Sequence, residues 1–359
     1  MKDIIRISIV LLAVSGLLLY AVSLLERSSA TTGSGTISVF NWGEYIDPEL
    51  IEQFEEETNI QVVYETFASN EAMMTKIEQG GTSYDVAMPS EYAIEKMKES
   101  DMLLPIDHSK IPNLENIDPY FLDLPFDPGN EYSIPYFWGT VGIAFNPTLL
   151  EDGQTFESWD DLWDPALSQE VVLVDSAREV IGMGLNSLGY SLNSTDMDKL
   201  REATEKLKTL GPNVKAIIGD EIVEMMRREE AAVALTWSGQ AADMMWINED
   251  IDFSVPQEGS NLWFDNMIIP ATATNVEGAH AFINFMLDAE VAAQNADYVG
   301  YSTPNEAATE LMDPEVIEDE RFYPPEELRG RLEVYENLGL EMLGVYNEFF
   351  LEFKMDMEN

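Results

Sequence analysis

Short apolar stretches alternate with amphipathic stretches along the chain that follows a hydrophobic N-terminal segment. Residues 36–41 (TISVFN) alternate apolar and polar side chains, a pattern typical of a half-buried strand. Asp47 and Pro48 then predict the start of a helix, because Asp is a good N-cap residue and Pro fits the first helical position. This helix is expected to run through residue 58 and to end at Asn59.

The same alternation continues through the next thirty or so residues of the sequence. A second strand is predicted at 60–66, and a third, short strand at 85–88. Between them, a helix is expected to begin with Asn70 as its cap and to end at Gly80 and Gly81. The order strand, helix, strand, helix, strand predicts a parallel sheet with helices on both faces.

A second region repeats this organisation. The further expected elements are strands at 141–145, 171–174, 214–218, 232–236 and 266–269, helices at 196–210, 221–229 and 276–287, and a helical tail from Pro325 onward. The length of 359 residues also favours about two domains. We therefore expect two α/β lobes with a cleft between them, and ligands in such folds lie at the carboxyl ends of the strands.

The N-terminal segment bears on location. Residues 7–25 are uncharged and largely apolar, and they follow Lys2 and Arg6. A helix of this length crosses about 30 Å of hydrocarbon, and the basic residues place its start on the inner side. A cleaved signal peptide is the alternative, with a small-residue site at 28–30 (SSA). Both interpretations export the rest of the chain, and we favour an anchor followed by a flexible tether at 28–35.

Composition narrows the possible functions. The chain has 67 Asp+Glu against 19 Lys+Arg, a formal net charge of −48. This charge excludes nucleic acid as the main partner, because a polyanion would be repelled. It favours cationic ligands, or it reflects only an acidic surface that keeps the protein in solution.

Several kinds of catalytic and metal chemistry have no basis in the sequence. Cysteine is absent, which excludes disulfides, thiol nucleophiles and Cys-ligated metals. The two histidines, His108 and His280, are far apart, and no G-x-S-x-G, H-E-x-x-H or G-x-x-x-x-G-K-[ST] motif occurs. We therefore predict no catalytic residue, no cofactor and no metal site.

Large aromatic side chains and carboxylates recur where the predicted strands end. The segments are 41–45 (NWGEY), 89–92 (PSEY), 175–179 (DSARE), Trp237, 263–265 (WFD) and 300–304 (GYSTP). A single aromatic or acidic residue at a strand end more often packs in the core or caps a helix. The repetition of such residues at one end of the sheets favours a ligand-binding site. Aromatic faces attract ammonium groups, and carboxylates supply the matching charge. Such a site suits an elongated organic polycation.

These residues resemble a known family, the extracytoplasmic spermidine/putrescine-binding proteins of bacterial polyamine ABC importers, in the periplasmic-binding-protein superfamily. The resemblance covers residue 36 to the C-terminus. Its most specific stretches are FNWGEYIDPELIEQFEEET at 40–58, YDVAMPSEYAIEKM at 84–97, PFDPGNEYSIPYFWGT at 125–140, DSAREV at 175–180 and GYSTPNEAA at 300–308. The anchored N-terminus is similar to forms from Gram-positive bacteria, which have no periplasm.

The resemblance implies a set of ligand contacts. Asp265 would be the main anchor for an ammonium, Glu179 would bind another, and the aromatic residues would enclose the methylene chain. The implied ligand-binding residues are Trp42, Tyr45, Ser90, Tyr92, Glu179, Trp237, Trp263, Asp265, Tyr301 and Glu336. Three positions differ from the best-known spermidine binder of the family: Glu336 replaces a Gln, Ser176 a carboxylate and Gly43 a Thr. The preferred polyamine length is therefore open.

The resemblance also implies the domain organisation and the partners. After an anchor and tether at 1–35, lobe 1 would comprise 36–140 and 266–311, and lobe 2 would comprise 141–265 and 312–359. Lobe closure around the ligand would be followed by delivery to an ABC permease and its ATPase. The protein is expected to be a monomer on the outer face of the cell membrane, or secreted or periplasmic if the segment is cleaved.

Two other functions remain open on the sequence. Paired carboxylates with aromatic subsites also describe glycoside hydrolases, so a carbohydrate-active enzyme is one alternative. A receptor for another cationic solute, such as a metal ion or a peptide, is the other. Iron would need clustered Tyr, His or carboxylate ligands, and the sequence has no such local cluster.

Overall fold

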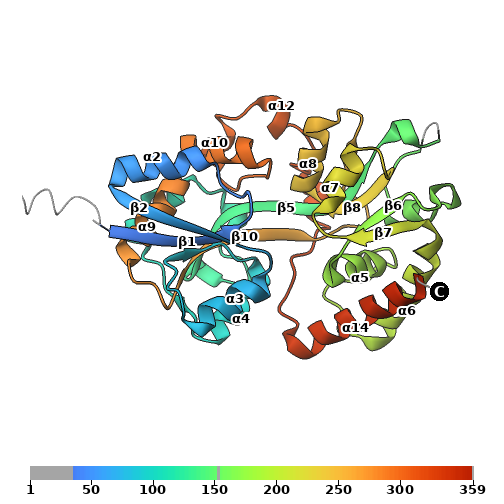
Figure 1. Ribbon diagram of the computed structural model, residues 1–359, viewed down its shortest axis with the longest axis horizontal. Helices are drawn as coiled ribbons and strands as arrows, with labels where there is room; N and C mark the ends of the chain where they lie inside the picture. The colour runs from blue at the N-terminus through green and yellow to red at the C-terminus, as the bar shows by residue number, and fades with distance from the viewer. Residues whose placement is uncertain (1–34, 152–153, 358–359) are drawn as a thin grey trace, which may run out of the picture.

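The computed structural model describes residues 35–151 and 154–357. The predicted membrane anchor at 7–25 lies outside the described residues. Within the described ranges, no helix is both long enough and apolar enough to cross a membrane. Two groups of strands and helices lie side by side, joined by long strands that run from one group into the other (Figure 1).

One mixed sheet runs through the whole molecule. Its order is β2 (Ile60–Phe67), β1 (Gly35–Trp42), β3 (Val86–Ala87), β10 (Leu262–Pro270), β5 (Ser133–Phe145), β8 (Val233–Trp237), β6 (Val171–Val174) and β7 (Val214–Ile218), with β4 (Leu103–Leu104) beside β10 and β9 (Asp252–Ser254) beside β5. The predicted parallel pairing is confirmed at both ends, where β1 pairs with β2 and β3, and β6 with β7 and β8. It is wrong in the middle, because β5 and β10 pair antiparallel with each other and with their neighbours.

Strand β5 connects the two halves of the sheet. Its residues 133–140 pair with β10, and its residues 141–145 pair with β8. The sequence pattern predicted only the second part, because the first part carries no apolar–polar alternation. All thirteen of its residues are buried, as expected for a strand that is covered on both faces.

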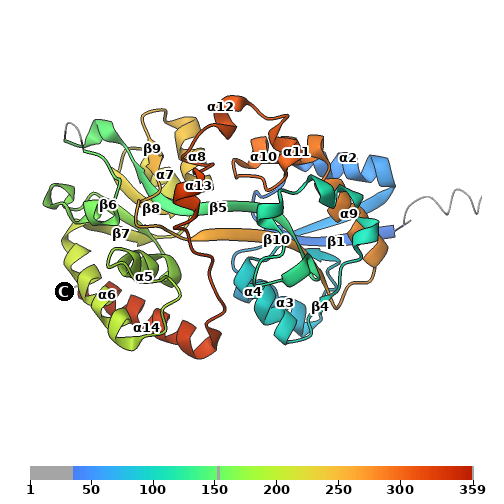
Figure 2. The same cartoon turned by 180° about the vertical axis from the view of Figure 1, so that it is seen from behind.

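The helices cover both faces of each half. Lobe 1, the half around β1, carries α2 (Pro48–Thr58), α3 (Asn70–Gln79), α4 (Glu91–Glu99), α9 (Val276–Met286), α10 (Ala289–Val299) and α11 (Glu306–Thr309) (Figures 1 and 2). Lobe 2, the half around β6, carries α5 (Ala177–Asn186), α6 (Met197–Leu210), α7 (Glu221–Arg227), α8 (Ser238–Ile247) and α14 (Gly339–Met357). Two short helices, α12 (Pro314–Ile317) and α13 (Glu326–Arg329), lie on the return path between them. The residue boundaries predicted for the two lobes stay a prediction.

The start of α2 follows the sequence prediction. The side chain of Asp47 accepts a hydrogen bond from the backbone N–H of Glu49, and Pro48 is the first helical residue. Asn59 ends the helix in the left-handed conformation, at φ 58°. Asp47, Pro48 and Asn59 all act on the ends of the same helix. Their effect on where the helix begins and ends could therefore be predicted from the neighbouring sequence alone.

The predicted cap of α3 is wrong. Ser69, not Asn70, caps this helix, and its side chain accepts from the backbone N–H of Ala72. The side chain of Asn70 is buried and bonds instead to Ser90 and Tyr92, across the gap between α3 and α4. A tertiary partner therefore outcompetes the local capping role.

The predicted helical tail is interrupted. Helix α13 ends at Arg329, and α14 begins only at Gly339. The intervening segment 330–338 runs between the two lobes (Figures 1 and 2). It is held by strand-like bonds, since the backbone N–H of Glu333 donates to Ser260 and its carbonyl accepts from Leu262. From there α14 packs on α5 and α6.

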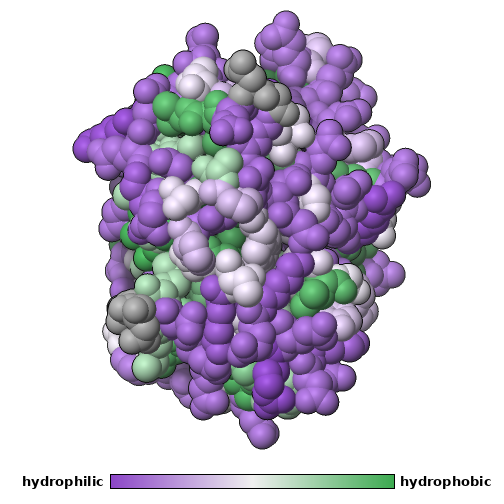
Figure 3. All heavy atoms as spheres, turned by 90° about the vertical axis from the view of Figure 1, so that its right-hand side faces the viewer, coloured by the Kyte–Doolittle hydropathy of each residue, from purple (hydrophilic) through white to green (hydrophobic). Residues whose placement is uncertain are grey.

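Most of the acidic side chains lie outside the cores. Figure 3 shows the end of the molecule formed by lobe 2, where hydrophilic residues predominate and apolar residues form only small, separate patches. The strong negative charge is therefore mainly a property of the surface. The few buried carboxyl groups need a specific explanation.

Asp85 provides a test of how one buried carboxylate holds lobe 1 together. Its two oxygens accept from the backbone N–H groups of Ser38, Thr274 and Asn275 at 2.9, 2.7 and 2.7 Å. Asp85→Asn places an N–H₂ group against one of these donors, so we expect unfolding free energy to fall by about 2–4 kcal/mol. Chemical denaturation measures this loss. The control is Asp250→Asn, at an exposed position, which should change the unfolding free energy by no more than about 0.5 kcal/mol. An equally small change for Asp85→Asn would contradict the structural role of Asp85.

Candidate functional site

Six buried carboxyl side chains occur among the described residues, and they fall into two groups. Three have structural partners: Asp47 caps α2, Asp85 binds backbone N–H groups, and Asp127 pairs with Lys98 at 2.9 Å. The other three are Glu91, Glu179 and Asp265. They lie on α4, α5 and β10, which come from both lobes. These three carboxyl groups define the candidate site.

Asp265 is held by two hydroxyl groups of lobe 1. The Tyr45 hydroxyl donates to its Oδ2 and the Ser90 hydroxyl to its Oδ1, each at 2.7 Å. Burial raises the pKa of Asp265 to about 6, although the two hydrogen bonds act in the opposite direction. The site therefore holds a carboxylate that has lost its water but has no cation beside it in an ion pair of 4 Å or less among the described residues. A ligand cation would supply the missing charge.

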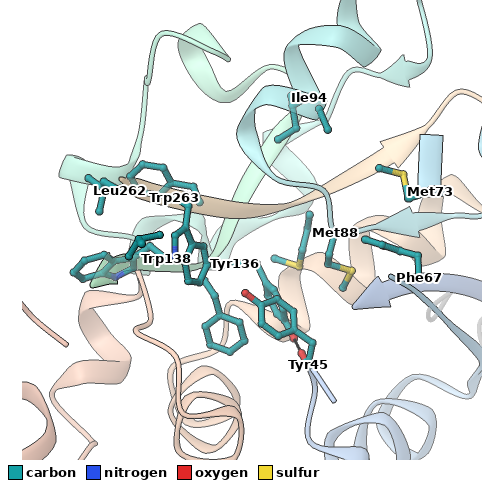
Figure 4. Packing of buried hydrophobic residues seen from close by; sticks show 14 of the residues in the cluster. Tyr45, Phe67, Met73, Met88, Ile94, Tyr136, Trp138, Leu262 and Trp263 are labelled. Carbon is teal, nitrogen blue, oxygen red and sulfur yellow. Dashed lines mark hydrogen bonds between the residues drawn. The ribbon is translucent and has the colours of Figure 1, made fainter. Parts of the chain in front are cut away.

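Three aromatic rings line this carboxylate. Tyr301 lies edge-on to Tyr45 and to Trp263, with ring centroids 5.3 and 5.2 Å apart. Trp263 and Tyr45 both belong to the main buried cluster, in which Tyr136 and Trp138 also lie (Figure 4). The rings therefore have fixed positions within the core and are not free surface groups.

Two glycines let these rings approach the backbone closely. A Cβ atom on Gly139 of β5 would lie 2.4 Å from the Trp263 ring, and one on Gly239 of α8 would lie 1.7 Å from the Tyr301 ring. Gly239 belongs to lobe 2, so the Tyr301 ring of lobe 1 rests directly on the opposite lobe. The spacing of the aromatic residues thus depends on both lobes.

A small hydrogen-bond network orients the lobe 1 side. The side-chain amide of Asn70 donates to the Tyr92 hydroxyl at 2.9 Å and to the Ser90 hydroxyl at 3.1 Å. Trp42 is the last residue of β1, and its buried Nε1 has no hydrogen-bond partner among the described residues. Asn70 was not predicted as a site residue, because its position in the sequence also suits a helix cap.

Glu179 is the carboxyl group that lobe 2 contributes. It lies in the first turn of α5 and accepts a hydrogen bond from the hydroxyl of Ser176. Burial raises its pKa, and hydrogen bonding from Ser176 and Trp237 works against this rise. Ser176 thus supports the neighbouring acid at the position where the resemblance led us to expect a carboxylate.

Glu336 differs in burial from the three carboxyl groups of the candidate site. Its side chain is exposed, and its backbone N–H donates to the Asn193 side chain at 2.9 Å. The neighbouring Tyr335 faces inward instead, with the Arg178 guanidinium 4.1 Å from the centre of its ring. Successive side chains in an extended segment point to opposite sides, so only one of these two residues can face Glu179.

Glu91 is a site residue that the sequence analysis noticed in its loop but did not assign. One of its oxygens accepts from the backbone N–H of Phe264 at 3.1 Å, and the other is buried with no hydrogen-bond partner within residues 35–151 and 154–357. Burial raises its pKa to about 8, with Asp265 adding to the rise and Arg178 opposing it. Its position between Ser90 and Tyr92, both assigned to the site, was the available signal.

The arrangement has the chemistry of a cation site. Carboxyl groups lie near aromatic rings that meet edge to face, which favours organic ammonium groups over hydrated metal ions. No group of three or more His, Asp or Glu residues that could hold a metal ion occurs in the described part of the chain.

Comparisons with known proteins identify the family of the chain. Residues 49–324 match the family described as bacterial extracellular solute-binding protein. The spermidine/putrescine-binding periplasmic protein of Escherichia coli is 40% identical over 322 residues, which is 89% of this chain and 92% of that protein. The putrescine-binding periplasmic protein PotF of the same organism is 33% identical, with 89% and 91% of the two chains covered.

Solved structures of binding proteins from polyamine transporters resemble this chain in sequence and in fold. The spermidine/putrescine ABC transporter substrate-binding protein PotD from Streptococcus pneumoniae is 55% identical, covers 90% of this chain and 100% of its own, and superposes with a TM-score of 0.85. The predicted two-lobed α/β fold class is thereby confirmed. The chain belongs to the bacterial extracellular solute-binding proteins, within the family of the spermidine/putrescine-binding proteins.

Proposed function

We propose that this protein is an extracytoplasmic polyamine receptor that encloses its ligand between the two lobes and delivers it to an ABC permease. The observation that carries the proposal is Asp265, a buried carboxylate that two hydroxyl groups orient beside the Tyr301 and Trp263 rings. A polyamine would place an ammonium on Asp265 and its methylene groups between the rings. The names of the relatives, which are binding proteins of transporters, support a receptor and not an enzyme.

The three buried carboxyl groups support a triamine as the preferred ligand. Spermidine carries three ammonium groups and putrescine two, and buried ammonium groups need matching charges. Asp265 on β10 and Glu179 on α5 offer two sites, and the second carboxyl oxygen of Glu91 offers a third. We assign the third ammonium to Glu91 and not to Glu336, whose side chain is exposed.

The proposed location is the outer face of the cell membrane. Residues 7–25 have the length and apolar character of a membrane-spanning segment, and residues 28–35 would tether the receptor. The E. coli relatives are named as periplasmic proteins, which supports export of this chain.

The first prediction concerns the charge of Asp265. Asp265→Asn removes the counter-charge of a buried ammonium, so the affinity for spermidine should fall by about 2–5 kcal/mol, or roughly 30-fold or more. Isothermal titration calorimetry measures the loss. The exposed Asp250→Asn should bind as the wild type does. A loss of less than about threefold, or roughly 0.7 kcal/mol, would remove Asp265 from the site.

The second prediction concerns Glu91 and ligand length. Because its pKa is about 8, Glu91 is protonated near neutral pH and must lose its proton to bind an ammonium. The ratio of spermidine to putrescine affinity should therefore rise with pH, by up to about tenfold per unit between about pH 6 and 7.5. Asp265, with a pKa of about 6, serves both ligands, so its titration largely cancels in the ratio.

Competition titrations with both polyamines across this pH range test the idea. The charged side chains that shift the pKa of Glu91 are Asp265 on β10 and Arg178 on α5. Neither of them is changed in the variant Glu91→Gln. Glu91→Gln should make the affinity ratio independent of pH. The matched control is Glu99→Gln, an exposed residue of the same helix. A wild-type ratio that does not change with pH would show that Glu91 does not bind the third ammonium.

The third prediction concerns the tether. If residues 7–25 anchor the receptor, the intact N-terminus should be found in the membrane fraction of cells that express the full chain. Mass spectrometry of the N-terminal peptide from membrane and medium identifies the form present. A mature protein that begins at Thr31 and occurs only in the medium would refute the anchor while leaving export intact.

A further inference from the structure

Three buried polar atoms that have no hydrogen-bond partner in the described part of the chain belong to residues that line one small cavity in lobe 2. They are the Tyr335 hydroxyl and the side-chain carbonyl oxygens of Asn186 and Asn261. Tyr335 and Asn186 are each 5% exposed and Asn261 is 2% exposed. Glu179 lines the same cavity, so the cavity lies directly behind a proposed ligand contact.

The hydrogen bonds of the two asparagines determine what the cavity can accept. The Asn186 N–H₂ group donates to the carbonyl of Tyr190 at 3.0 Å, and the Asn261 N–H₂ group donates to the carbonyl of Glu333 at 3.2 Å. Both amide groups are thereby fixed with their oxygens left as acceptors. An occupant must donate two hydrogen bonds to them and can accept one from the Tyr335 hydroxyl.

The size of the cavity limits the occupant further. Its volume is about 10 Å³, on the scale on which one water molecule needs roughly 10–15 Å³. The remaining lining is largely apolar, from Val141, Trp159, Met183 and Leu192. There is room for one water molecule and none for the alkyl chain of an organic ligand.

We propose that this cavity binds one structural water molecule, which donates to Asn186 and Asn261 and accepts from Tyr335. Two donated bonds and one accepted bond match the three that a buried water usually makes. This water would join α5, the residues just before β10 and the segment 330–338. It would complete the surface beneath Glu179 without being part of the ligand, and it does not depend on which ligand the protein binds.

Tyr335→Phe provides the first test, because the two possibilities predict opposite signs. If water binds the hydroxyl, its removal breaks a hydrogen bond, and the melting temperature of the ligand-free protein should fall by about 1–4 °C. If the hydroxyl is buried without a partner, its removal relieves a desolvation penalty and the melting temperature should stay unchanged or rise.

Two variants calibrate the measurement. Tyr346 is also buried in lobe 2, and its hydroxyl donates to the carbonyls of Leu192 and Ser194 at 2.9 Å, so Tyr346→Phe gives the effect of losing a satisfied hydroxyl. Tyr298 is 56% exposed, and Tyr298→Phe should change little. A Tyr335→Phe effect that matches Tyr298→Phe, or a rise in the melting temperature, would overturn the proposal.

High-resolution crystal structures of the protein without and with spermidine provide the second test. We expect a water peak within hydrogen-bond distance of the Tyr335 hydroxyl and both amide oxygens in each of them. An empty cavity in either structure, or a ligand nitrogen in place of the water, would overturn the proposal. The melting temperatures and one of the two crystal structures are measured on the ligand-free protein. A failure of the protein to bind polyamines would therefore leave the test of the water site intact.

Discussion

The structure depends on the burial of carboxyl groups at the junction of two lobes. A carboxylate that loses its water is costly unless hydrogen bonds and a counter-charge replace it. Asp265 receives the hydrogen bonds, from Tyr45 and Ser90, but no Lys or Arg among the described residues forms an ion pair with it. Under the proposed function, a ligand ammonium would supply this counter-charge.

The scaffold that permits this burial is the pair of long central strands. β10 carries both Trp263 and Asp265, and β5 runs beside it from lobe 1 into lobe 2. Side chains on buried strands have little freedom, so the carboxylate and the ring are held before any ligand arrives. Gly139 and Gly239 contribute by their lack of a side chain, which leaves space for the Trp263 and Tyr301 rings.

The acidic surface and the buried acids act over different distances. A net charge of −48 attracts cations toward the protein, but salt screens this attraction over about 8–10 Å. The buried groups are screened much less, and they act only on an ion that has entered between the lobes. Under the proposed function, the surface charge would raise the encounter rate for any cation, while selectivity would depend on the few buried carboxyl groups and rings.

Local features of the sequence determined much of the fold and part of the candidate site. Asp47, Pro48 and Asn59 act through hydrogen bonds and backbone preferences within one helix, so their roles could be predicted without a structure. The aromatic and acidic residues that follow β1, β3 and β6 could likewise be predicted, because these strands run parallel to their neighbours. Trp263 and Asp265 lie inside β10, which pairs antiparallel, so this reasoning does not account for them.

Other roles were decided only by the tertiary structure. Asn70 could cap a helix locally, but the approach of Ser90 and Tyr92 gives it stronger partners. The choice between Tyr335 and Glu336 depends on which face of an extended segment meets α5, and the carboxyl of Glu91 meets the backbone of Phe264 from 173 residues away. Such contacts depend on how distant segments pack in three dimensions, and no local pattern of residue types contains that information.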